Sequence, residues 1–167
     1  MVPGQAEPDA PERARAERAL DHLDELYSLA RHLCGNTSDA EDLVQDTYTR
    51  ALTGRFEEGT NLRAWLFRIL RNAFLDHARR KQIVLEIPDD TLDPPDPGPD
   101  ALRYVTAAEV VRAIGELPVE MRFVVVLDVE GFSESEIADI VRCAPGTVKS
   151  RLSRGKARLR AQLGGGQ

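Results

Sequence analysis

A chain of 167 residues, 42% of them hydrophobic and 30% charged, can form one compact domain or two small ones. No apolar run approaches the roughly 20 residues that cross a bilayer, which predicts no membrane insertion. The start of the chain holds acids and prolines where a secretory signal has a basic end and an apolar stretch. The formal net charge is -6, and we expect a cytoplasmic protein.

Cysteine and histidine do not form the pattern of a catalytic or metal site. Cys34 and Cys143 lie far apart and make no CxxC pair, and the three histidines form no motif. GxSxG, HExxH and phosphate-binding glycine loops are missing from the sequence. We therefore expect reduced, structural cysteines, no metal, no cofactor and no enzymatic activity.

The N-terminal 18 residues are small, charged and punctuated by proline, which is typical of a disordered or loosely helical arm. Apolar residues then recur at helical spacing from Leu20 to Leu33. Gly35 and Asn36 follow, as residues that end helices do. The sequence therefore predicts a first helix between these points.

A second helix is predicted after this glycine. In the sequence SDAE, Ser38 and Glu41 have the spacing of a capping box, and Gly54 ends the segment. The apolar residues of this helix share one face. Three polar side chains fall toward another face: Asp42, Gln45 and Asp46.

A third, longer helix follows a loop, and Asn61 can cap it. It interleaves cations with aromatic and amide side chains, which suit unstacked nucleic acid bases. Trp65 and Phe74 lie on its apolar stripe, so we expect them in the core. The side chains that stay available for bases or for the nucleic acid backbone are Asn72, Asp76, His77, Arg68, Arg71 and Arg79.

A change of composition follows the third helix. Residues 86–100 carry five prolines and six acids and offer little to bury. Proline removes backbone donors and disfavours helix in its neighbours, so we predict a flexible, extended linker at residues 83–100. It joins two domains, predicted at residues 19–82 and 101–163, and a short tail occupies residues 164–167.

The second domain is also predicted to be helical. Helical spacing begins near Ala101, and Pro118 and Gly131 mark the start and the end of a further helix. The run FVVVL at residues 123–127 could by itself form a strand, but it is short and lacks hairpin signals, so we predict helix. SESE at residues 133–136 forms a capping box. The predicted fold class is therefore all-α, with two small helical domains.

Positive charge gathers in two segments of this acidic chain. Residues 63–81 hold six cations and one acid, and residues 147–160 hold six cations and no acid. Basic segments on an acidic background suit a polyanion such as nucleic acid. Two solvated helix faces would carry the same charge, so charge alone does not decide the function.

The C-terminal end has the helix-turn-helix pattern, a short helix, a turn and a longer basic helix. The second helix of this motif fits the major groove, with its N-terminal residues against base edges. Val148 and Leu152 point inward, and cations lie on the opposite side. The residues that suit base edges are Lys149, Ser150, Ser153 and Arg154, and those that suit phosphates are Arg151, Lys156 and Arg158. The alternative is a helical hairpin with a basic outer face, and the coincidence of cations, turn and apolar set favours DNA binding.

The chain resembles alternative bacterial sigma factors of the extracytoplasmic-function (ECF) type in three motifs, DAEDLVQDTYTRAL, GTNLRAWLFRILRNAFLDHARRK and GFSESEIADIVRCAPGTVKSRLSRGKARL. The resemblance runs from about Asp21 to Leu163. It implies two helical domains, regions 2 and 4, which bind core RNA polymerase and direct it to promoters. Region 4 would read the -35 element as duplex, and region 2 would open the -10 element and capture a flipped base. Control by an anti-sigma factor is also implied.

The resemblance assigns roles to particular positions. It implies that polymerase is contacted by Asp42, Gln45 and Asp46. It implies that the flipped-base pocket includes Asn72 and Asp76. The positions where the -35 bases would be read are Lys149, Ser150, Ser153 and Arg154.

Three residues of the helix-turn-helix depart from the pattern of this family. Ala144 stands where a capping side chain would help the last helix to start, at a loss of about 1 kcal/mol. Gly155 lies inside that helix and costs about as much again relative to alanine. Cys143 in the turn is unusual: a redox switch is the alternative, and a small buried residue is the expected role.

Two other classes of function are alternatives to this one. An ordinary helix-turn-helix regulator would bind duplex operators without polymerase, and acidic residues beside an aromatic and basic helix argue against it. An enzyme that uses cysteine or histidine chemistry lacks a catalytic constellation in this sequence. Promoter-specific transcription with purified core polymerase separates all three.

Overall fold

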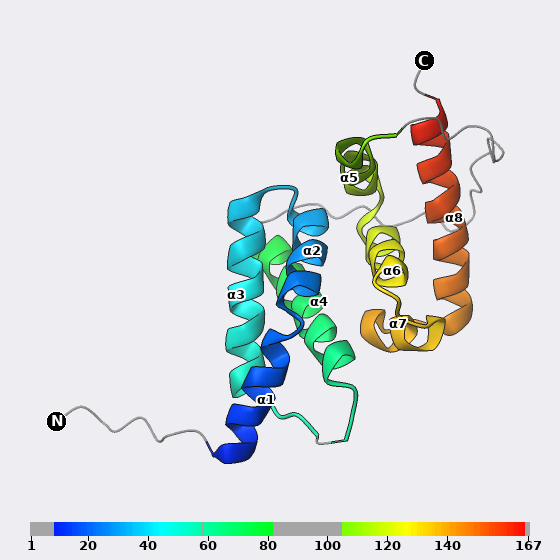
Figure 1. Ribbon diagram of the computed structural model, residues 1–167. Helices are drawn as coiled ribbons and strands as arrows, with labels where there is room; N and C mark the ends of the chain where they lie inside the picture. Colours follow the sequence, from blue (N-terminus) through cyan, green and yellow to red (C-terminus); the bar gives the residue numbers. More distant parts are fainter. Residues whose placement is uncertain (1–8, 58, 82–104, 166–167) are drawn as a thin grey trace.

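The structure, a computed structural model, describes residues 9–57, 59–81 and 105–165, and all regular secondary structure in these ranges is helical (Figure 1). The all-α prediction is confirmed. The predicted linker at residues 83–100 and the first eight residues lie outside the described residues. None of the helices in the described part is long and apolar enough to cross a membrane.

The N-terminal half consists of α1 (Ala10–Leu20), α2 (Leu23–Cys34), α3 (Thr37–Thr53) and α4 (Leu62–Arg80). Helices α2, α3 and α4 pack against one another, and α1 contacts α4. Their shared core is made of leucines at helical spacing that are shielded from solvent: Leu26, Leu29, Leu43, Leu66 and Leu70. This core fixes α4 against α3, so the polar residues of both helices lie near one another.

The C-terminal half consists of α5 (Ala107–Glu116), α6 (Val119–Val129), α7 (Glu134–Val141) and α8 (Pro145–Gly164). Helix α6 is the centre of this half, because it packs against α7 and α8 and also against α2. Seven of its 11 residues are buried. The run FVVVL is therefore apolar on all sides because it is surrounded by helices, and its prediction as helix is confirmed.

The two halves pack directly on each other, with α4 against α7 and α2 against α5 and α6. Two aromatic pairs join them, each in an edge-to-face arrangement. The ring centroids of Phe67 and Phe132 are 4.9 Å apart, and those of Phe74 and Phe123 are 5.8 Å apart. One continuous hydrophobic cluster thus runs through both halves, a feature that the sequence pattern did not predict.

The start of α3 differs from the predicted capping box. Gly35 ends α2 in the left-handed conformation with a φ of 77°, and the next residue, Asn36, is extended. The side chain of Asn36 accepts a hydrogen bond from the backbone N–H of Asp39 at 2.9 Å, so the helix begins at Thr37. Ser38 is therefore inside the helix, and the predicted pairing of Ser38 with Glu41 is wrong.

The first helix of the C-terminal half also begins later than predicted. It starts at Ala107 instead of near Ala101, because Thr106 and Glu109 form a capping box that the sequence reading missed. The start of the first predicted helix is also wrong, because Leu20 ends a separate helix, α1, which begins at Ala10, and α2 begins at Leu23. The ends predicted at Asn61 and at Ser133 are confirmed. Asn61 caps α4, and Ser133 and Glu136 form the predicted capping box at α7.

Candidate nucleic-acid interface

Helices α7 and α8 form a helix-turn-helix. Helix α7 ends at Val141, and the next residue, Arg142, adopts the left-handed conformation with a φ of 54° and so turns the chain. Ala144 supplies no side-chain cap to α8, as predicted, but Pro145 at the first helical position removes one of the N–H groups that have no partner at a helix start. Val148 and Leu152 are buried and attach α8 to the rest of the C-terminal half.

The side chains predicted to read bases lie along the first half of α8. Lys149 and Ser153 are exposed, and Ser150 and Arg154 are half-buried. The spacing of three and four residues between them places them on neighbouring positions of one helix surface. Figure 1 shows α8 at the outer edge of the molecule, so this surface can approach DNA without moving another helix.

The cations predicted for phosphates have different surroundings. A guanidinium nitrogen of Arg151 lies 3.7 Å from a carboxylate oxygen of Glu120 on α6, and its side chain is only 16% exposed. The ammonium group of Lys156 lies 2.9 Å from the carboxylate of Asp128 on α6, and Arg158 is half-buried. Arg151 therefore faces α6 in this arrangement instead of the outer surface.

Gly155 explains how closely α8 approaches α6. It is buried, and a Cβ atom at this position would lie 2.8 Å from a methyl carbon of Val125 and 3.8 Å from the Cβ of Met121. A glycine is needed here because a side chain would push the two helices apart. Gly155 lowers the helix propensity of α8, but it allows α8 to pack closely on α6.

The polar residues of α4 divide between two sides. Arg68 and Asn72 are half-buried and four residues apart, so they share a side, and Arg79 is 79% exposed. Arg71 points to the other half of the molecule, where its guanidinium lies 2.9 Å from the carboxylate of Glu120. The Arg71 side chain is 11% exposed.

A charge cluster joins α3 to α4. Arg50 donates to Asp46 at 3.2 Å and to Asp76 at 2.8 Å, and the His77 ring lies 2.8 Å from the other oxygen of Asp46. The structure thus brings together a residue predicted for polymerase and two predicted for the -10 element. Arg50 was missed, although its position four residues after Asp46 is a signal for an ion pair.

Hydrogen bonds set the ionisation of both aspartates in this cluster. The hydrogen bond from Arg50 holds the pKa of the Asp76 carboxyl below its ordinary value of 3.8. Burial opposes ionisation of Asp46, but hydrogen bonds from Arg50 and His77 outweigh it, so the pKa of Asp46 is also lowered. Both carboxylates therefore stay charged near neutral pH.

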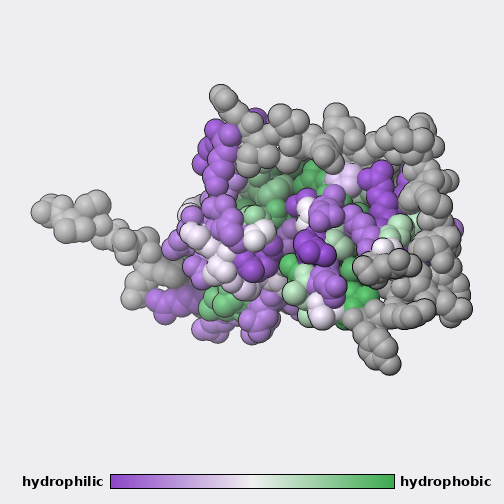
Figure 2. Space-filling model, turned by 90° about the horizontal axis from the view of Figure 1, so that it is seen from above, coloured by the Kyte–Doolittle hydropathy of each residue, from purple (hydrophilic) through white to green (hydrophobic). Residues whose placement is uncertain are grey.

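The other residues predicted for polymerase, Asp42 and Gln45, are exposed on α3. Asp42 lies at the edge of a cavity of about 650 Å³ between the two halves, which is also lined by Arg80 and Lys81. Figure 2 looks down on the molecule and shows apolar side chains in the middle of this face, with hydrophilic ones around them.

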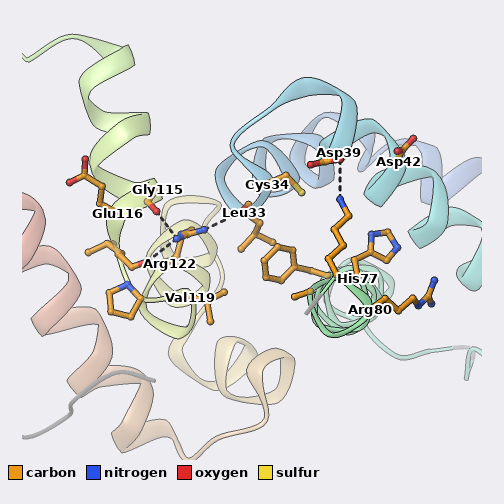
Figure 3. Close-up of a pocket in the computed structure, with 15 residues that line it drawn as sticks. Leu33, Cys34, Asp39, Asp42, His77, Arg80, Gly115, Glu116, Val119 and Arg122 are labelled. Atoms are coloured by element: carbon orange, nitrogen blue, oxygen red, sulfur yellow. Dashed lines mark hydrogen bonds and ion pairs between the residues drawn. The ribbon is translucent and has the colours of Figure 1, made fainter. Parts of the chain in front are cut away.

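Arg122 of α6 closes one side of this cavity (Figure 3). Its guanidinium donates to three backbone carbonyls, those of Leu33, Gly115 and Leu117. These carbonyls lie at or near the C-terminal ends of α2 and α5, where a positive charge is favourable. Arg122 therefore joins the two halves through the ends of their helices.

Cys34 lines the same cavity. Burial raises the pKa of its thiol to about 11, and nearby Asp39 adds to this effect. The thiol is therefore protonated and weakly nucleophilic at neutral pH. Among the described residues, no group of three or more histidine, cysteine or acidic side chains is arranged to hold a metal ion.

Two family models match the chain, one in each half. Residues 19–83 match Sigma-70 region 2, and residues 107–159 match Sigma-70 region 4. The first match contains the described α2, α3 and α4, and the second contains α7 and most of α8.

Individual proteins are similar over most of the chain. The ECF RNA polymerase sigma factor SigE of Mycolicibacterium smegmatis is 40% identical over 156 residues, which cover 88% of this chain and 60% of that protein. The ECF RNA polymerase sigma factor EcfG of Rhodopseudomonas palustris is 38% identical, over 83% of this chain and 78% of that protein.

Solved structures are similar as well. The sigma factor RpoE of Bartonella quintana, in complex with the anti-sigma factor NepR, has a TM-score of 0.71 at 35% identity and covers 88% of this chain and 94% of that one. CnrH, in complex with the cytosolic domain of CnrY, has a TM-score of 0.68 at 27% identity and covers 93% of this chain and 91% of that one.

Proposed function

Because the chain belongs to the ECF family of bacterial RNA polymerase sigma factors, we propose that it binds core RNA polymerase and directs promoter-specific transcription initiation. It acts in the cytoplasm as a transcription regulator and not as an enzyme. Helix α8 reads the -35 element as duplex DNA, and the N-terminal half opens the -10 element.

The observation that carries this proposal is the outward face of α8 in the helix-turn-helix. Lys149 and Ser153 are exposed at the N-terminal end of this helix, which is the part that contacts base edges in the motif. Val148 and Leu152 hold the opposite side in the core, so the exposed face is presented rigidly. Arginine, lysine and serine are suitable residue types for reading duplex DNA in the major groove.

Contact with polymerase is assigned to Asp42, Gln45 and Asp46 on α3. Asp42 and Gln45 are exposed, so a partner can reach both. Asp46 is half-buried and holds Arg50 and His77, so it shapes the surface as well as carrying charge. Asp42 is therefore the better position for a test, because replacing it leaves the α3–α4 charge cluster intact.

Capture of the opened -10 strand is assigned to one side of α4, where Arg68, Asn72 and Asp76 follow one another at intervals of four residues. Arg79 adds an exposed cation to this side, and His77 lies beside it. An amide can hydrogen-bond a base edge, and the cations attract the backbone of a single strand.

Control by an anti-sigma factor is the remaining part of the proposal. It is supported by the similarity to RpoE of Bartonella quintana, whose structure was solved with the anti-sigma factor NepR. That similarity extends over 88% of this chain and therefore includes both halves.

Run-off transcription with purified core polymerase tests the proposal. The full chain should start transcription at its own promoters, and Asp42→Arg should lower the yield by weakening the complex with core polymerase. DNA binding by α8 should be unaffected by this change. Binding to duplex operators with no promoter-specific transcript would instead identify an ordinary helix-turn-helix regulator.

A further inference from the structure

One carboxylate lies between the two helices to which DNA contacts were assigned. Glu120, in the first turn of α6, has its Oε1 atom 2.9 Å from Arg71 of α4 and its Oε2 atom 3.7 Å from Arg151 of α8. The side chains of Glu120, Arg71 and Arg151 are 21%, 11% and 16% exposed, respectively. A single acid therefore holds one cation from each of the two helices, away from solvent.

We propose that this group, the Glu120 latch, is an intramolecular brake that holds the two halves together and competes with promoter DNA for Arg71. The competition with DNA rests on the function proposed above, whereas the holding of the halves does not. When the halves separate, Glu120 stays beside Arg151 because both belong to the C-terminal half. Arg71 then loses its carboxylate partner and becomes available to a phosphate.

Other contacts in the same interface follow the same pattern. The side-chain amide of Asn61, the residue that caps α4, donates to the carboxylate of Glu136 at 2.9 Å. Arg63 of α4 donates to the backbone carbonyl of Glu130 and lies over the ring of Phe132, 3.9 Å from its centroid. Oxygen atoms of the C-terminal half thus accept hydrogen bonds from polar side chains at the start of α4, in addition to the ion pair at Glu120.

The latch is built so that it can open. The Nε atoms of Arg71 and Arg151 and the Oε2 atom of Glu120 are buried without a hydrogen-bond partner among the described residues. A buried charged network that is only partly hydrogen-bonded stabilises a structure less than a complete one. The aromatic contacts supply non-directional attraction, and the ion pair between Glu120 and Arg71 adds a specific, breakable contact.

Glu120→Gln tests the latch because it removes the charge and nearly keeps the shape. Single-molecule energy transfer between dyes at the exposed positions Thr53 and Arg160 reports the separation of the halves in the full chain, with both native cysteines replaced by serine. We expect the fraction of open molecules to rise about tenfold, as breaking a coupled charge pair does. Asp128→Asn is the matched control, because Asp128 is also on α6 and pairs with Lys156 of α8, and it should leave the open fraction unchanged.

Arg71→Gln cuts the same ion pair from the other half. If the latch exists, it should also raise the open fraction, and the double variant should add little to either single change. If circular dichroism shows that Glu120→Gln is poorly folded, Arg71→Gln still tests the latch. Equal open fractions for Glu120→Gln, Arg71→Gln and Asp128→Asn would overturn the proposal.

DNA binding tests the competition. Without polymerase, Glu120→Gln should bind a promoter fragment with a pre-melted -10 element several-fold more tightly than the wild type. The double variant with Arg71→Gln, which opens but lacks the released cation, should lose this gain. Halves that open without any gain in DNA affinity would overturn the role as a brake. Failure of run-off transcription would instead contradict the proposed function, while the energy-transfer result would still decide whether the latch exists.

Discussion

The two basic helices, α4 and α8, have similar lengths and are both rich in cations, but they occupy different places in the molecule. Helix α4 has α2 and α3 on one side and α7 on another, whereas α8 packs on α5, α6 and α7 from the outer edge (Figure 1). Lys149 of α8 is exposed, whereas Arg71 of α4 is turned toward Glu120. Position in the fold, and not the number of cations, therefore decides which basic residues can meet DNA directly.

This difference has a functional consequence. Helix α8 can meet duplex DNA in the arrangement described here, because its outer face has no other helix over it. Helix α4 keeps only one side open, and its other side is covered by the C-terminal half. The proposed order of events is therefore that Arg71, on the covered side of α4, acts after the halves have separated, when polymerase and opened DNA replace the covering contacts.

The largest expected effect tests whether α4 is covered. Phe67 is fully buried and contacts Phe132 of the other half, so Phe67→Ala should lower the free energy of unfolding by about 3–5 kcal/mol. Leu52→Ala is the control, because Leu52 is 61% exposed and should cost little. Urea unfolding of the full chain measures both. Similar small losses of unfolding free energy for the two variants would mean that the C-terminal half does not cover the side of α4 that carries Phe67.

The next effect concerns base reading by α8. Arg154→Ala should weaken binding to the cognate -35 duplex by about 1–3 kcal/mol and relax the preference at one or two base positions, because an arginine fork matches the O6 and N7 atoms of guanine. Arg158→Ala removes the same charge further along the helix and should weaken all sequences alike. Titrations of cognate and scrambled duplexes compare them. Equal losses on both duplexes for Arg154→Ala would assign it to phosphate only.

A third effect tests how α8 is held. Gly155→Ala should destabilise the protein, because the new methyl group meets Val125 and overpacking costs about 1–3 kcal/mol, more than the roughly 1 kcal/mol gained in helix propensity. Gly146→Ala, in the same helix, has open space around the new atom and should be neutral or stabilising. Thermal unfolding separates the two. A stabilising Gly155→Ala would mean that α8 does not approach α6 closely.

The sequence predicted most of the fold because its helices follow local rules. Asn61, Pro118 and the pair Ser133 and Glu136 each act within a few residues of their own position, and all were identified correctly. The start of α3 was misplaced because two polar residues near Gly35 could cap, and the left-handed turn of that glycine decided between them.

The candidate site was harder to predict, because the environment of a charged side chain depends on distant partners. Arg71 and Arg151 have the spacing of outward cations, yet Glu120 attracts both across the packed helices. Periodicity places a residue on a side of its helix but does not show which helix covers that side. Gly155 shows the same limit, since its cost in helix propensity is visible in the sequence and its contact with Val125 is not.

The smallest expected effect concerns acid stability and the charge cluster between α3 and α4. Arg50 lowers the pKa of Asp76 below 3.8, so the unfolded chain binds a proton there more readily than the folded one. The stability that this group contributes is therefore fully present above pH 3.8 and is lost as the pH falls through the lowered pKa. The pKa of Asp46 is also lowered, so it contributes in the same direction.

Arg50→Gln should remove most of this contribution. Urea titrations from pH 5 down to pH 3, roughly the range over which such a carboxylate titrates, measure the free energy of unfolding. This free energy should fall less steeply with pH in Arg50→Gln than in the wild type. Asp128→Asn breaks an ion pair in the other half and should keep the wild-type slope. Parallel curves for the wild type and Arg50→Gln would mean that the cluster does not stabilise the fold. In that case the roles of Asp46 and Asp76 would be limited to binding polymerase and DNA, and the contact between α3 and α4 would depend on its leucine core alone.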